Sequence, residues 1–211
     1  MEDARCALTF LSVQTEVDRE RLGLLGTSFG GAVVLHVGAI DERAKAIVCF
    51  DGIGSGRRWL RNLRRHREWI DFLERLDQER IKRVLTGQSE YVEYNVINPY
   101  ADHPGLKSAH EDRRRQFPGW QAELTLETAQ AVIEFAPEEM ASLISPRALM
   151  VIYDSNPRSF AVEEAKCIYA KAREPRCLAS IPATARQYGH YFGEELEHWI
   201  SLSADWYQRY L

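Results

Sequence analysis

Residues 21–35 have the sequence RLGLLGTSFGGAVVL, in which three patterns follow one another. The short apolar run at residues 22–25 predicts a buried strand. The next five residues, Gly26 to Gly30, match the G-x-S-x-G pattern of a nucleophile elbow, where a serine occupies the turn between a strand and a helix. Small and apolar residues at 31–35 predict that helix. The run therefore predicts Ser28 as a nucleophile at the carboxyl end of a strand.

The glycines on either side of Ser28 have a steric explanation. The backbone of such an elbow turns sharply, so side chains two residues before and after the serine would collide. We therefore expect both Gly26 and Gly30 to be needed as residues without a side chain. The amino end of the following helix would supply backbone N–H groups, including that of Phe29, to hold an oxyanion.

With these residues in place, the sequence resembles the α/β-hydrolase family. The segment Val17-Asp18-Arg19-Glu20-Arg21-Leu22-Gly23 looks like the V-D-x-x-R-I-G lead-in of its dienelactone-hydrolase-like and acyl-peptidase-like esterases. The run that begins at Ser145-Pro146-Arg147 looks like the approach to the seventh strand of the family. The resemblance implies an α/β fold, with a mostly parallel sheet flanked by helices. It also implies an esterase-like serine hydrolase that acts on an ester or related acyl bond.

The family order along the chain is serine, then acid, then histidine. His190 follows the last predicted strand, at residues 177–181, in a Gly-His-aromatic loop, so the resemblance implies His190 as the base. The usual H-G-x-x-D pattern would place the acid where this chain has Pro157. Three alternatives follow: Asp154 orients His190 from three residues earlier, Asp51 does so from the end of the preceding strand, or the triad lacks an acid.

The other periodic segments complete this architecture. Helices are predicted at residues 3–14, 162–172 and 194–210, and strands at 44–50 and 148–153. The strand–helix–strand unit at residues 22–50 predicts parallel pairing with a right-handed crossover. We expect residues 1–52 and 136–211 to form the hydrolase core. Residues 53–135 are expected to form a helical cap insertion and not an independent domain.

Ser28 lies early in the chain for a complete α/β-hydrolase, in which several strands precede the elbow. We therefore expect the C-terminal part of the core without the N-terminal strands, including the segment that supplies a second oxyanion N–H in the family. The strand at residues 22–25 would then lie close to an open sheet edge. Exposed apolar edges favour association, so a homo-oligomer through this edge is expected as one way of covering it.

Composition narrows the class of protein further. The chain has 211 residues, 45% of them hydrophobic, and a net charge of −4, which suits one soluble globular domain and gives no reason to expect nucleic acid as a partner. The arginines at residues 57–67 are interleaved with acidic residues further on and favour a solvated helix face. No apolar run reaches the length of a membrane span, and the first residues are acidic and lack a signal-peptide core, so we expect a cytoplasmic protein.

Three functions fit these observations. The first is hydrolysis of a small-molecule acyl substrate through Ser28 and His190, with no metal or organic cofactor. The second is a truncated or inactive hydrolase fold that serves as a binding or assembly module, which Pro157 in the acid position favours. The third is acyl transfer to a nucleophile other than water, which would use the same residues.

Overall fold

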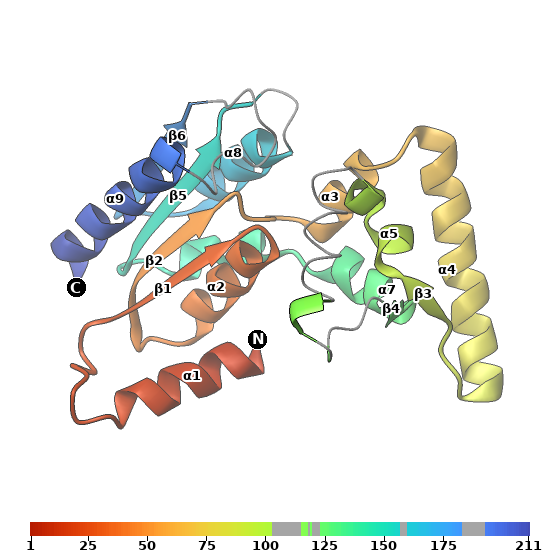
Figure 1. The fold of residues 1–211 in the computed structure, drawn as a ribbon, viewed down its shortest axis with the longest axis horizontal. Coiled ribbons are helices and arrows are strands. Elements are labelled where there is room, and N and C mark those ends of the chain that lie inside the picture. Colours follow the sequence, from red (N-terminus) through yellow and green to blue (C-terminus); the bar gives the residue numbers. More distant parts are fainter. Residues whose placement is uncertain (103–114, 118, 120–122, 157–159, 183–192) are drawn as a thin grey trace. The chain divides into compact units, whose positions relative to one another are not determined.

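The computed structural model describes residues 1–211 except 103–114, 118, 120–122, 157–159 and 183–192 (Figure 1). The chain divides into two compact units. The first combines Met1–Ser55 with Ala136–Leu211, and the second is Gly56–Phe135. The role of the second unit as a cap stays a prediction.

The first unit contains a parallel four-stranded sheet in the order β1-β2-β5-β6. Its elements are α1 (Glu2–Ser12), β1 (Leu22–Thr27), α2 (Phe29–Ile40), β2 (Ala44–Phe50), the 3-10 helix η2 (Pro137–Leu143), β5 (Ala148–Asp154), α8 (Ala161–Lys171), β6 (Arg176–Ile181) and α9 (Gly193–Tyr210). The predicted fold class, a mostly parallel sheet flanked by helices, is confirmed.

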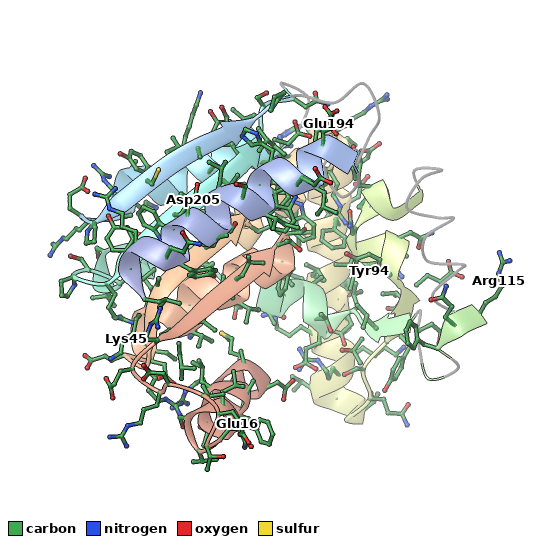
Figure 2. The ribbon with its side chains drawn as sticks, turned by 60° about the vertical axis from the view of Figure 1, so that its left-hand side comes forward. Glu16, Lys45, Tyr94, Arg115, Glu194 and Asp205 are labelled. Atoms are coloured by element: carbon green, nitrogen blue, oxygen red, sulfur yellow. The ribbon has the colours of Figure 1, made fainter. Side chains whose placement is uncertain are left out.

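Helices cover both faces of this sheet, which explains why β2 and β5 are almost continuously apolar. On one face, side chains from α2, η2 and α8 pack against Ile47, Cys49, Leu149 and Val151. On the other face, α9 contributes Trp199 and Trp206 to a core that includes Phe50, whose ring stacks on Trp199 with 4.7 Å between centroids. Figure 2 shows α9 running along the strands, with Glu194 near one end of the helix and Asp205 further along it.

The strand β1 is the terminal strand of the described sheet. Leu22 is buried, whereas 43% of the Leu25 surface is exposed. The hydroxyl of Tyr207 on α9 donates a hydrogen bond of 2.7 Å to the carbonyl oxygen of Leu24. Pairing of this strand with a second copy of the chain stays a prediction.

The second unit is mainly helical. Its elements are α3 (Gly56–Asn62), α4 (His66–Thr86), β3 (Tyr91–Glu93), α5 (Tyr94–Ile97), the 3-10 helix η1 (Pro99–Asp102), β4 (Glu123–Thr125) and α7 (Glu127–Glu134). The short strands β3 and β4 pair antiparallel. The buried face of α4 consists of Trp69, Phe72, Leu76 and Glu79, a spacing of three and four residues that places them on one side of the helix.

One arginine of the segment at residues 57–67 corrects the expectation of a solvated face. Arg64 is buried, and its guanidinium donates to the carbonyl oxygens of Leu60, Val96 and Ile97. It also lies 3.8 Å from the centroid of the Phe72 ring. Burial lowers the pKa of Arg64 to about 10. This arginine therefore ties α3 to α5 within the second unit.

Among the helices that the structure describes, none combines the length and the apolar character that crossing a membrane requires.

Candidate active site

Three of the residues singled out from the sequence lie at one edge of the sheet. The register pairs Thr27 with Phe50, and Phe50 with Ile152. Ser28 and Asp51 directly follow two of these paired residues, and Asp154 ends β5. Because the strands are parallel, all three residues lie at the carboxyl edge, where α/β sheets place their binding and catalytic groups.

The backbone at Ser28 has the geometry of a nucleophile elbow. Ser28 lies between β1 and α2 with φ at 52° and ψ at −121°. Residues other than glycine rarely adopt this backbone conformation. Its N–H donates a hydrogen bond of 2.9 Å to the carbonyl oxygen of Phe50. Serine at the start of a helix normally caps the helix with its hydroxyl, but Ser28 makes no such bond. The hydroxyl is thus not used to cap α2.

The elbow is possible because the backbone of Gly26 packs against the first turn of α2. A Cβ built on Gly26 would lie 2.5 Å from the carbonyl carbon of Gly30 and 2.9 Å from the nitrogen of Gly31. Both neighbours are backbone atoms, so neither has a rotamer that could move aside. The steric argument needs a correction at Gly30, where an added Cβ would meet no atom within 4 Å.

A second close approach, which the sequence reasoning missed, joins α2 to the segment after β2. A Cβ on Gly31 would lie 2.7 Å from the Cα of Gly52 and 3.1 Å from the Sγ of Cys49. The signals for it are the Gly30-Gly31 pair after the serine and the Asp51-Gly52 pair after a buried strand. Because Gly31 and Gly52 have no side chains, Asp51, the residue before Gly52, can lie close to the elbow.

Gly26→Ala is expected to destabilise the first unit by about 2–3 kcal/mol, because the new methyl group would overlap backbone of the elbow. Chemical denaturation measures this change. Gly30→Ala is the matched control, since its methyl group enters open space and adds helix propensity inside α2. Equal stability of the two variants would contradict the proposed packing.

Asp51 is buried and has an unusual backbone. It is 6% exposed, and its φ is 47°. Its Oδ1 accepts a hydrogen bond of 2.8 Å from the backbone N–H of Asp154. Burial raises the pKa of Asp51 to about 7, the nearby Asp154 carboxylate adds to the increase, and the Asp154 N–H opposes it. The neighbouring Cys49 thiol is fully buried, and its pKa is raised to about 12, which makes it an unreactive core group.

Asp154 is buried beside Asp51, at the end of the adjacent strand. Its Oδ1 accepts a hydrogen bond of 2.9 Å from the backbone N–H of Asn156 and so stabilises the turn that follows β5. The structure thus brings the two candidate acids, Asp51 and Asp154, into direct contact through a side chain and a backbone N–H.

A third buried carboxylate fixes the segment after Asp51. Glu164, on α8, is completely buried. Its Oε2 accepts hydrogen bonds from the N–H groups of Gly54 at 2.7 Å and Ser55 at 3.0 Å. The carbonyl oxygen of Gly54 in turn accepts the N–H of Glu138 at 3.1 Å. Glu164 therefore holds the segment that leads away from β2, a role that no sequence pattern indicated.

His190 and Pro157 lie outside the described residues. The proposed role of His190 therefore rests on its place in the sequence after β6. Within the described ranges, no group of three or more His, Cys, Asp or Glu side chains is arranged to hold a metal ion.

Solved structures with the same arrangement identify the fold. A hypothetical protein of Pseudomonas aeruginosa, PA2218, aligns over 100% of this chain and 67% of its own with a TM-score of 0.76 and 22% identity. The α/β hydrolase GrgF from a Penicillium species aligns over 99% of this chain and 70% of its own, with a TM-score of 0.71 and 17% identity. The chain has the α/β-hydrolase fold. The resemblance drawn from the sequence is thus confirmed for the fold.

Sequence comparison adds relatives of this chain. A model of the acetyl xylan esterase (AXE1) family matches residues 1–87, a range that includes Ser28 and Asp51 and ends before Asp154. An uncharacterised 31.7 kDa protein of Escherichia coli, from the traX-finO intergenic region, is 26% identical over 213 aligned residues, which cover 100% of this chain and 72% of that protein. PA2218 is 26% identical over 87% of this chain and 52% of its own length.

Proposed function

We propose that this α/β-hydrolase hydrolyses esters of small acyl groups through a covalent intermediate on Ser28. The observation that carries the proposal is the elbow: Ser28 has a positive φ, its N–H is bound to Phe50, and its hydroxyl does not cap α2. Strained backbone of this kind is stored mainly at functional sites. The match of residues 1–87 to the acetyl xylan esterase model supports an ester as the substrate class.

Acyl transfer at this site would proceed in two stages. In the first, His190 takes the proton of the Ser28 hydroxyl, and Oγ forms a bond to the carbonyl carbon of the ester. His190 then gives the proton to the leaving alkoxide as the ester bond breaks. In the second stage, His190 takes a proton from water, and the resulting attack on the acyl carbon breaks the Oγ–carbon bond. The proton returns to Ser28, which leaves a carboxylic acid as the product.

The beginning of α2 supports stabilisation of the tetrahedral oxyanion. Phe29 is the first residue of the helix, so its N–H is one of the first N–H groups of α2. They lie at the positive end of the helix dipole, beside Ser28. We assign the Phe29 N–H as one oxyanion donor, an arrangement worth about 3–4 kcal/mol for a single donor in a serine protease.

The base can be tested by comparing two histidines. His190→Ala is expected to lower kcat for p-nitrophenyl acetate by about 10³-fold or more, because no other group would remove the Ser28 proton. His198→Ala is the matched control, since His198 is exposed on α9, and it should retain wild-type kcat. A spectrophotometric assay of p-nitrophenol release, with esters of increasing acyl length, measures kcat for both variants.

Two results would contradict this function. Equal loss in both histidine variants would show that His190 has no special role. Absence of any Ser28-dependent hydrolysis would favour the inactive binding module. Release of p-nitrophenol only when an alcohol or amine acceptor is added would instead indicate acyl transfer.

A further inference from the structure

We propose that the free edge of β1 pairs antiparallel with β1 of a second copy of this chain, across a twofold axis at Leu25. The two four-stranded sheets would then join into one. In the part of the chain that the structure describes, β1 has β2 on one side and no strand on the other. Pairing at this edge is independent of catalysis at Ser28.

The backbone groups that face the free edge follow from the pairing of β1 with β2. In a parallel sheet the N–H and C=O groups of successive residues point alternately to one neighbouring strand and to the other. The N–H of Ser28 binds the carbonyl oxygen of Phe50 on the β2 side. The register with β2 is continuous from Gly23 to Thr27, so every second residue before Ser28 also faces β2. Gly23, Leu25 and Thr27 therefore direct their backbone groups to the free edge.

This edge is accessible at the residues that would pair. Gly23 is exposed, and so is 43% of the Leu25 surface. The Tyr207 hydroxyl binds the carbonyl oxygen of Leu24, a residue that faces β2, so it does not occupy any of the three outward residues. Proteins usually protect a sheet edge with a charged residue or a proline, and β1, with the sequence LGLLGT, has neither. An edge of this kind is a template for another strand.

The order of the outward residues fits a second copy of the same strand. A twofold axis makes the paired strands antiparallel and closes the assembly at two chains. With the axis at Leu25, Gly23 of each chain lies opposite Thr27 of the other. All three outward residues of each strand then form hydrogen-bonded pairs, with about six backbone hydrogen bonds in total. A shift of the axis along the strand leaves either Gly23 or Thr27 opposite no residue of β1.

The side chains also match in this register. The three outward residues share one face of the strand, so Leu25 of one chain would pack against Leu25 of the other. This contact would bury an apolar side chain that is partly exposed in the single chain. On the opposite face, Leu24 of each chain would lie across from Gly26 of the other, a large residue against one without a side chain. Like charges would not meet within the paired strands.

Helix α1 adds apolar surface at the same side of the sheet. Figure 1 shows α1 next to β1, on the side of the sheet opposite β6. Leu8 packs this helix against Leu22 of β1. In contrast, Phe10 is 63% exposed, and Val13, directly after the helix, is 71% exposed. Exposed apolar side chains that gather in this way are typical of interaction surfaces.

Sedimentation velocity at protein concentrations up to about 100 µM tests the proposal, since dimerisation depends on concentration. The wild-type chain is expected to sediment as a dimer. Leu25→Lys should weaken dimerisation by about 100-fold or more, because two positive charges would replace two apolar side chains at the axis. Leu143→Lys is the matched control, since Leu143 is 57% exposed on η2, and it should remain dimeric.

Leu25→Pro tests the backbone pairing itself. It removes an N–H that faces the free edge and keeps the bonds to β2, so the variant should fold and be monomeric. Leu24→Pro removes an N–H that faces β2 and should lower the melting temperature much more. Amide hydrogen exchange of the wild-type protein needs no substitution in the strand. The N–H groups of Gly23 and Thr27 should be protected in the dimer and exchange rapidly in Leu25→Lys.

A dimer that is lost in Leu25→Lys and kept in Leu143→Lys supports the proposal. A wild-type chain that stays monomeric at the highest concentration overturns it, and so does a dimer that persists in both Leu25 variants. A dimer lost in Phe10→Asp but kept in Leu25→Pro would place the interface on α1 and would also overturn it. If Leu25→Pro does not fold, Leu25→Lys and the exchange of the wild-type amides decide. Absence of Ser28-dependent hydrolysis would leave each of these results unchanged.

Discussion

Ser28→Ala is expected to lower kcat for p-nitrophenyl acetate by about 10⁴–10⁶-fold, because the variant cannot form the acyl intermediate. The position already has a φ of 52°, which strains alanine and serine alike, so the fold should be retained. The assay is initial-rate hydrolysis, with circular dichroism to check the fold. Ser201→Ala, an exposed serine on α9, is the matched control and should keep wild-type activity.

Ser28→Gly extends this test to the strain at the elbow. Glycine adopts a positive φ without a steric penalty, so the variant should be as inactive as Ser28→Ala but more stable by about 1 kcal/mol. Urea denaturation of the two variants measures the difference. Residual activity near the wild-type value in either variant would contradict the role of Ser28. Lower stability of the glycine variant would contradict strain at this residue.

Asp51 is expected to make the protein less stable as the pH rises. The pKa of Asp51 is about 7 in the folded protein and 3.8 in the unfolded chain. Between pH 3.8 and about pH 7 the folded state therefore holds a proton that the unfolded state has lost. The stabilisation from this proton is complete below pH 3.8 and is lost as the pH rises through about 7. A difference of this size corresponds to about 4 kcal/mol, as an order of magnitude.

Asp51→Asn should therefore flatten the fall in the free energy of unfolding between pH 4 and pH 8. Relative to wild type, the variant should gain stability across this range, by up to about 4 kcal/mol. Urea titrations at five or six pH values measure the two curves, and Asp205→Asn controls for the removal of one charge. Parallel curves for wild type and Asp51→Asn would show that Asp51 titrates as an ordinary carboxyl.

Local patterns were sufficient for much of the fold. Alternation between short apolar runs and helical periodicity placed β1, α2, β2, β5, α8, β6 and α9 within a few residues of their observed bounds. The elbow was predictable because a residue without a side chain is a local steric requirement at Gly26, although not at Gly30. The parallel pairing of β1 and β2 followed from the crossover rule, since α2 connects these two strands.

Features that depend on distant contacts were not predictable from local patterns. Arg64 looks like one more solvent-exposed arginine, and its burial depends on carbonyl groups of α5 that lie more than thirty residues away. Glu164 looks like an acidic residue in the first turn of a helix, yet it binds backbone more than a hundred residues away. The positive φ of Asp51 and the close approach of the next residue, Gly52, to Gly31 likewise leave no periodic pattern in the sequence.

The central claim is that Ser28 becomes covalently acylated. The most direct measurement is peptide mass spectrometry of the wild-type protein after brief reaction with a fluorophosphonate or a slowly hydrolysed p-nitrophenyl ester. The elbow geometry predicts one equivalent of label on the peptide that contains Ser28, and no label in Ser28→Ala. Label on a different residue, or an unmodified Ser28 peptide under conditions in which the ester is consumed, would contradict the claim.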